Sequence, residues 1–134
     1  MLSCSRILTL KTYGPNKLFD ITSEVEKIAQ EIRHGLLILQ AKGSTGAIVL
    51  LPDDKQIVSK FEHDLWDLLP VYGWRHPGNA YAHLRSTLLK TILVIPIVTG
   101  EIEYNAHIFF LENQATVNKE RHIIVLKVSR KKES

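Results

Sequence analysis

The chain has 134 residues, of which 45% are hydrophobic and 23% are charged, and its formal net charge is +3. This length and apolar content suit one domain with a buried core and are too small for two. Three basic residues and Glu133 in the last five residues contribute a net +2, so the rest of the chain is almost neutral. That distribution argues against a nucleic-acid partner, because the excess charge lies on a tail. We therefore expect one domain over residues 1–129 and a charged tail over 130–134.

Cysteine content and hydropathy indicate the compartment. Cys4 is the only cysteine, which excludes an intrachain disulfide and a thiolate metal cluster. The first residues lack a long apolar run with a cleavage pattern, and the longest apolar stretch, residues 92–98, is too short to span a membrane. The sequence predicts a cytoplasmic protein without a membrane partner.

Hydrophobic periodicity predicts the order of the elements. Alternating apolar and polar residues indicate half-buried strands, whereas apolar residues spaced three and four apart indicate an amphipathic helix. In chain order we expect a strand over 6–12, a hairpin partner over 17–21, a helix between 22 and 34, strands over 36–40 and 47–51, a helix over 55–69, a short helix over 79–89, and strands over 91–98, 101–111 and 121–129. This order predicts an α+β domain with a mixed or antiparallel sheet, a sandwich-like core, two main helices and a short motif helix.

Local signals define several element ends. Thr22-Ser23 followed by Glu26 forms a capping-box pattern, which predicts the start of the first helix. Pro70 ends the second helix, because proline lacks the N–H that a helix interior requires. Thr99-Gly100 predicts a hairpin between the strands on either side, and Pro96 within the first of them indicates an edge position or a bulge.

The segment from residue 74 to residue 85 has the composition of a site. Two histidines, an asparagine and two arginines surround a Pro-Gly turn: Arg75, His76, Asn79, His83 and Arg85. Asn79 occupies a helix N-cap position, which places a positive helix start beside Arg75 and His76. Such a start favours a phosphate or carboxylate, and the imidazoles are suited to act as acid, base or metal ligand. The alternative is a plain cap with two partly buried polar histidines.

Further ligand-binding candidates are a loop and the two arginines. The loop over residues 43–46 predicts either a backbone nest for phosphate, with the hydroxyls of Ser44 and Thr45 as donors, or a plain turn. It lacks the lysine and the spacing of a P-loop. Arg75 and Arg85 are candidates for phosphate clamps, although an arginine more often pairs with a surface carboxylate.

The motif around His83 carries a family resemblance. Arg75-His76 is followed by Asn79-Ala80-Tyr81-Ala82-His83-Leu84, and then by Leu88-Leu89, Pro96 and Gly100 in order. In these blocks the sequence resembles the YjbQ-like family, also called the secondary thiamine-phosphate synthase family. The family motif has a Tyr or Trp and a His, and then Asn-Ala-x-Ala-His-Leu. The resemblance implies a small single-domain protein that forms trimers.

Three other blocks differ from the family pattern. Gly43 stands where the resemblance places a histidine, Leu51-Pro52 where it places an Asn-Glu pair, and His107 where it places a tryptophan. These changes leave the periodicity, and hence the implied fold, unaltered. The implied site has three histidines and a carboxylate, whereas this chain retains His76 and His83. His107 is either a replacement for the lost imidazole or an ordinary polar strand residue.

The resemblance implies a homotrimeric enzyme that joins a pyrimidine diphosphate to a thiazole phosphate and releases pyrophosphate. Arg75, His76 and Asn79 would hold phosphate oxygens, and His83 would carry a proton or bind a metal. His76 and His83, with His107, are the expected ligands of a divalent metal, magnesium or zinc. The alternative is a catalytically impaired trimeric relative that acts as a structural or phosphate-ligand-binding protein, because the missing imidazole and carboxylate would form the acid and base pair.

Overall fold

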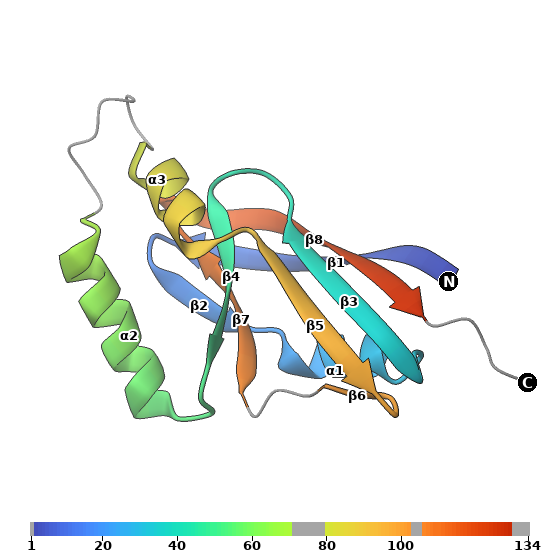
Figure 1. Ribbon diagram of the computed structural model, residues 1–134. Coiled ribbons are helices and arrows are strands. Elements are labelled where there is room, and N and C mark those ends of the chain that lie inside the picture. Colours follow the sequence, from blue (N-terminus) through green and yellow to red (C-terminus); the bar gives the residue numbers. More distant parts are fainter. Residues whose placement is uncertain (1, 71–79, 103–105, 130–134) are drawn as a thin grey trace, which may run out of the picture.

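Two antiparallel sheets and three helices make up the computed structural model, which describes residues 2–70, 80–102 and 106–129. In chain order the elements are β1 (Leu2–Gly14), β2 (Lys17–Asp20), α1 (Thr22–Ala29), β3 (His34–Ala41), β4 (Gly46–Leu51), α2 (Lys55–Leu68), α3 (Ala80–Leu89), β5 (Ile92–Val98), β6 (Glu101–Ile102), β7 (His107–Glu112) and β8 (Thr116–Ser129) (Figure 1). The predicted α+β domain with a sandwich-like core is confirmed.

The strands divide between a larger and a smaller sheet. The larger sheet has the order β1-β8-β3-β5-β6, and the smaller sheet has the order β2-β7-β4. Neighbouring strands in both sheets pair antiparallel throughout the described part of the chain. β1 and β3 belong to the larger sheet, while the strands that follow them, β2 and β4, belong to the smaller one. The chain therefore crosses repeatedly between the two sheets.

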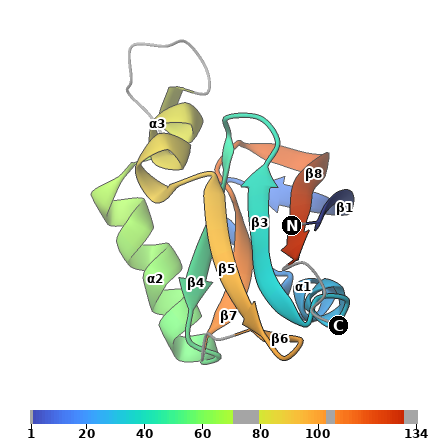
Figure 2. The same cartoon turned by 45° about the vertical axis from the view of Figure 1, so that its right-hand side comes forward.

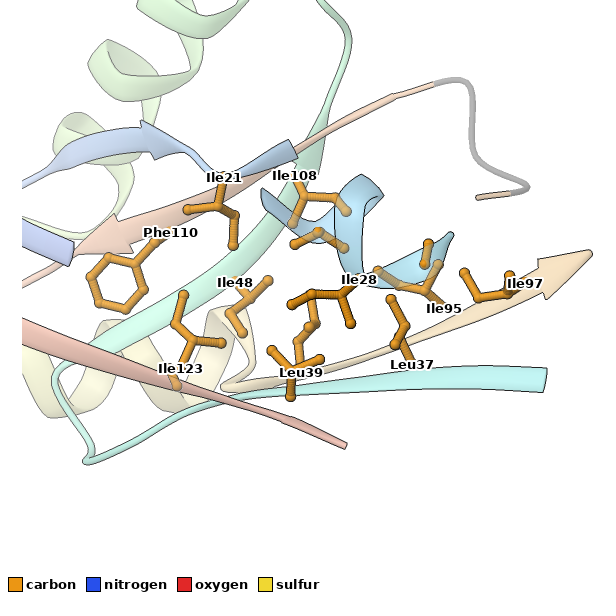
Figure 3. Close-up of a cluster of buried hydrophobic side chains, with 14 of the residues drawn as sticks. Ile21, Ile28, Leu37, Leu39, Ile48, Ile95, Ile97, Ile108, Phe110 and Ile123 are labelled. Carbon is orange, nitrogen blue, oxygen red and sulfur yellow. The ribbon is translucent and has the colours of Figure 1, made fainter. Parts of the chain in front are cut away.

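The main core lies between α1 and the inner faces of the sheets. Alternate residues of β3 and β5 point inward, so that Leu37, Leu39, Ile95 and Ile97 are at most 1% exposed. Figure 3 shows these side chains gathered with Ile28 of α1 and with isoleucines from the smaller sheet. Their removal from water is the dominant stabilising contribution in a domain of this size.

A second, smaller core lies under α2. Leu65 packs there with Ala47 of β4 and Leu111 of β7. Figure 2 shows α2 alongside β4, with α1 on the other side of the molecule. The smaller sheet is therefore covered on both faces. None of the described helices is long and apolar enough to cross a membrane.

The start of α1 differs from the capping-box prediction. The N-cap residue Ile21 makes no side-chain cap; instead, Oδ1 of Asp20 accepts from the backbone N–H of Thr22 at 2.9 Å and from its hydroxyl at 2.5 Å. The Thr22 hydroxyl in turn accepts from the N–H of Ile108 at 2.9 Å. The carboxylate at the end of β2 thus takes the place of the predicted capping box, and the contact with Ile108 holds Thr22 against β7.

Two predicted strand connections are wrong. The strand after the 14–16 turn is not a hairpin partner of β1, because β1 pairs with β8 and β2 pairs with β7. Residues 101–111, predicted as one strand, contain β6 in the larger sheet and most of β7 in the smaller one. The chain changes sheet at both places, which local alternation does not reveal. The helix predicted between 22 and 34 ends earlier, at Ala29, and His34 begins β3.

Other element ends agree with the sequence signals. Oδ1 of Asp54 accepts from the N–H of Gln56 at 2.9 Å and from that of Ile57 at 3.3 Å, which caps α2. α2 stops two residues before Pro70. Within the described residues, β6 pairs with β5 at Ile97 and Val98, and Pro96 pairs with Leu36 of β3 on the other side.

We predict that Leu39→Ala lowers the free energy of unfolding by about 2–5 kcal/mol, because it leaves a cavity at a fully buried position. Chemical denaturation followed by circular dichroism measures this change. Leu68→Ala is the matched control, since that side chain is 77% exposed, and it should change the free energy by less than about 0.5 kcal/mol. Equal losses in the two variants would contradict the core described above.

Candidate functional site

His83 and Ser44 form a hydrogen-bonded pair between α3 and the loop that joins β3 to β4. Oγ of Ser44 lies 2.8 Å from Nδ1 of His83. His83 belongs to the first turn of α3, and Ser44 follows Gly43, whose φ of +97° disfavours any residue with a side chain. The glycine therefore allows the turn that brings the hydroxyl to the imidazole. Two residues predicted for different roles meet at one place.

A hollow of about 460 Å³ opens beside this pair, a volume typical of small-ligand sites. It lies between the β3–β4 loop and the end of α3, and we call it the Ser44–Lys90 hollow. Its lining consists of Gly43, Ser44, Ser86, Thr87, Lys90, Thr91 and Ile92. Hydroxyl groups and a lysine in the lining suit a ligand with anionic oxygens.

Thr87 and Lys90 are lining residues that sequence reasoning missed. They follow His83 by four and seven residues, and α3 ends at Leu89. The spacing of four places Thr87 on the face of α3 that carries His83, whereas Lys90 lies just beyond the end of the helix. The spacing from His83 was therefore a signal for Thr87. Thr87 also donates from its hydroxyl to the carbonyl of His83 at 2.9 Å, which ties it to the first turn of α3.

Thr45 is turned away from Ser44 and into the protein, with 7% of its surface exposed. Its Oγ1 accepts from Nη2 of Arg121 at 2.7 Å, and its carbonyl accepts from the N–H of Asn113 at 3.1 Å. Of the two hydroxyls in the predicted phosphate nest, Ser44 lines the hollow and Thr45 anchors the loop.

Arg85 lies inside the protein rather than on the hollow. It is fully buried, and it donates from Nε to Oδ1 of Asn113 at 3.0 Å, from Nη1 to the carbonyl of Leu69 at 3.0 Å, and from Nη2 to Oδ1 of Asn16. Burial lowers the pKa of Arg85 to about 10, so it stays protonated at neutral pH. The predicted phosphate clamp does not fit this placement, because the guanidinium faces acceptors of the protein itself.

His107 lies at the opposite end of β4 from Ser44. It pairs across the ladder with Leu51, whereas Gly46 pairs with Glu112. The two ends of β4 are about 17 Å apart, at about 3.4 Å for each residue of a strand. His107 and His83 therefore do not share one metal site, contrary to the expectation that His107 replaces a lost imidazole there.

Two carboxylates flank the imidazole of His107 instead. Nδ1 lies 2.7 Å from Oδ2 of Asp20, and Nε2 lies 3.5 Å from Oδ2 of Asp53. The hydrogen bond with Asp20 and the nearby negative charges raise the pKa of His107. Burial alone would raise the pKa of Asp20, but the hydrogen bonds from Thr22 and His107 outweigh it and lower that pKa.

The remaining candidates, Arg75, His76 and Asn79, lie outside the described residues. Within ranges 2–70, 80–102 and 106–129, no three His, Cys, Asp or Glu side chains are grouped so that they could hold a metal ion. Three histidines were predicted as metal ligands. Among the described residues, His83 lies beside the hollow and His107 lies at the other end of β4.

Comparison with known sequences places the chain. A family model described as UPF0047 protein YjbQ-like matches residues 6–130. The chain belongs to this family. It is similar to the UPF0047 protein of Archaeoglobus fulgidus, with 32% identity over 111 residues that cover 78% of this chain and 87% of that protein. It is also similar to the UPF0047 protein of Methanothermobacter thermautotrophicus, with 31% identity over 126 residues and 88% of each chain covered.

Solved structures share the YjbQ-like fold. A YbjQ-like protein of unknown function from Sulfolobus solfataricus has a TM-score of 0.83 and 24% identity, with 96% of this chain and 100% of that chain covered. A YjbQ/UPF0047 protein from Clostridium acetobutylicum has a TM-score of 0.81 and 23% identity, with 92% and 99% covered. The resemblance to the YjbQ-like family is thereby confirmed for sequence and fold.

We predict that His107 stabilises the fold less as the pH rises. Its folded pKa is raised above the ordinary value of 6.5, so its contribution is complete below that value and is lost as the pH rises through the folded pKa. Thermal melting of wild type and His107→Gln between about pH 5 and about pH 9 spans this range. The difference in Tm should shrink toward high pH.

Asp53→Asn is the matched control, because it leaves the shorter contact with Asp20 in place. It should retain most of the pH dependence of the wild type. A difference in Tm between wild type and His107→Gln that stays constant or grows with pH would contradict the prediction.

Proposed function

We propose that the protein binds a small phosphorylated ligand in the Ser44–Lys90 hollow and acts on it as a transferase of the thiamine-phosphate synthase type. In that reaction a pyrimidine diphosphate joins a thiazole phosphate and pyrophosphate leaves. The observation that carries the proposal is the Ser44–His83 pair, in which a hydroxyl and an imidazole lie 2.8 Å apart beside a hollow that Lys90 also lines. The choice of substrates comes from the resemblance of the His83 motif.

The lining of the hollow supports a role in holding phosphate oxygens. Lys90 supplies a positive charge and Ser44 supplies a hydroxyl. As pyrophosphate departs, negative charge grows on its oxygens, and a positive group already in position stabilises that charge. In this proposal Arg75, His76 and Asn79, from the segment before α3, complete the set that holds phosphate.

His83 supports the proposed transfer as a proton carrier. A neutral imidazole accepts a proton near pH 7 and returns it later, which is the usual role of histidine in acid and base catalysis. The hydroxyl of Ser44 fixes the orientation of the ring through Nδ1. Ligand imidazoles in metal sites are oriented in the same way, so His83, together with His76, also suits a divalent metal such as magnesium or zinc. Such an ion would add positive charge toward the leaving pyrophosphate.

A phosphate-binding or structural protein without catalysis is the second candidate. Gly43 lines the hollow at the position where the resemblance places an imidazole, and a glycine offers no acid or base. Leu51-Pro52 stands in place of the Asn-Glu pair, and His107 lies at the far end of β4 and does not compensate. On this reading the hollow binds a phosphorylated ligand that is not converted.

We also propose that the protein forms a homotrimer through the outer face of the larger sheet. Directly paired residues share one face of a sheet, and Ile38 pairs there with Val94 and Leu126. Val94 is 45% exposed and Ile7 on β1 is 58% exposed. None of the described helices covers this face (Figures 1 and 2). An exposed apolar sheet face fits a second copy of the chain. That the assembly has three subunits follows from the family resemblance.

We predict that the wild-type protein, supplied with both substrates and magnesium, forms thiamine phosphate. His83→Ala should lower the rate about 100-fold or more, because a positioned acid or base typically contributes at least that much. His63→Ala, an exposed histidine of α2, is the control and should leave the rate unchanged. Product formed equally fast by wild type and His83→Ala would contradict the role of His83.

Calorimetric titration with inorganic pyrophosphate separates the two candidates. Binding that weakens about tenfold in Lys90→Ala, but without any product from the wild type, selects the binding protein. Lys60→Ala, exposed on α2, is the matched control and should bind as the wild type does. Absence of both product and pyrophosphate binding would overturn the transferase and the phosphate-binding protein.

We predict a mass in solution of three times the 15.3 kDa of the chain. Val94→Asp should reduce this mass to that of one chain, because it places a charge in the middle of the apolar face. Light scattering after size-exclusion chromatography measures the mass. Val117→Asp, at a side chain that is 93% exposed near the start of β8, is the control and should remain trimeric. A monomeric wild type would contradict the proposed assembly.

A further inference from the structure

Two consecutive buried residues at the end of β7 connect the two halves of the Ser44–His83 pair. Glu112 is the last residue of β7 and Asn113 follows it, and both are fully buried. One reaches the loop that carries Ser44, and the other reaches the helix that carries His83. Neither lines the hollow.

Glu112 reaches the loop through Arg121. Its Oε1 accepts from Nε of Arg121 at 2.7 Å, and its Oε2 accepts from Nη2 of the same guanidinium. That Nη2 also donates to Oγ1 of Thr45 at 2.7 Å, and Thr45 is the residue next to Ser44. The hydroxyl of Thr12 donates to Oε1 of Glu112 at 2.6 Å and completes the contacts of that oxygen. The loop is therefore held by charge-assisted hydrogen bonds away from water.

Asn113 reaches both the loop and the helix. Its backbone N–H donates to the carbonyl of Thr45 at 3.1 Å. Its Oδ1 accepts from Nε of Arg85 at 3.0 Å, and its Nδ2 donates to Oγ of Ser86 at 2.9 Å. Arg85 and Ser86 lie on α3, two and three residues after His83. A single residue thus connects α3, through its side chain, to the loop, through its backbone N–H.

We propose that Glu112-Asn113 is the positioning element of the candidate site, which holds Ser44 and His83 at hydrogen-bonding distance. A buried ion pair contributes little net stability compared with apolar residues of similar volume, so stability alone does not account for this arrangement. A fully satisfied polar network does fix one geometry, because every alternative leaves a buried donor without an acceptor. The use of this geometry in ligand binding rests on the proposed function, whereas the geometry itself does not.

The test uses Thr45, because its hydroxyl is the last link on the loop side. Thr45→Val removes that link and keeps the shape of the side chain. NMR of the His83 ring nitrogens reads out the pair directly, and Ser44→Ala supplies the reference spectrum for a broken pair. We expect the ring signals of Thr45→Val to move toward those of Ser44→Ala. Thr45→Ser, which restores the hydroxyl, should give the wild-type signals.

Thr9→Val is the matched control, because the hydroxyl of Thr9 also bonds an imidazole, that of His122 at 3.1 Å, on a different strand pair. It should leave the His83 signals unchanged. Wild-type His83 signals in a folded Thr45→Val variant would overturn the proposal. If thermal melting shows that Thr45→Val is unfolded, Ser86→Ala tests the helix side in the same way, and wild-type signals there would overturn it.

Affinity for inorganic pyrophosphate is the second readout. We expect Thr45→Val to weaken it about tenfold, the order of effect when a buried donor loses its acceptor. Changed His83 signals in a protein that binds no pyrophosphate at all would support the positioning role and count against the proposed function alone. Unchanged His83 signals in a Thr45→Val variant that binds pyrophosphate normally would overturn the positioning role and leave the proposed function standing.

Discussion

The ion pair between Arg121 and Glu112 is the interaction that links the architecture of the fold to the candidate site. Arg121 belongs to β8 of the larger sheet and Glu112 to β7 of the smaller one, so their contact joins the two sheets. Taking both charges out of water is costly unless their remaining donors and acceptors are satisfied. Thr12 and Thr45 supply those partners, and the guanidinium lies 5.8 Å from the ring centroid of Phe110. Among the described residues, every buried polar side-chain atom has a hydrogen-bond partner.

Local pattern was sufficient to predict the elements but not the way they pair. The strand at β3 and the helix at α2 were predicted close to their observed bounds, because alternation and amphipathic spacing are properties of neighbouring residues. The crossings between sheets after β1 and β6 were missed, since pairing partners lie far away in the chain. Asp20 was missed as the partner of Thr22 for the same reason: it acts at the junction of a strand and a helix, not within one pattern.

The candidate site was predictable to the extent that one segment carries it. His83 and Ser44 came from a motif and a loop, and the structure brings them together. Arg85 was misplaced because the residues that accept its hydrogen bonds, at positions 16, 69 and 113, come from three separate segments. His107 was assigned correctly to a strand, but only the register with β4 shows at which end of the sheet it lies. The residue types thus indicated which side chains could take part in a site, whereas the sheet topology was needed to show where each of them lies.

The position of β8 has a consequence for how the chain is made. β8 follows every other strand in the sequence, yet in the larger sheet it lies between β1 and β3. While the chain is being synthesised, β1 therefore has no neighbour in its sheet, and the carboxylate of Glu112 has no guanidinium to meet. Pairing of such distant segments is slow, and unpaired strand edges favour aggregation in the meantime. The loop that carries Ser44 therefore gains its contact with Arg121 only after β8 has been made.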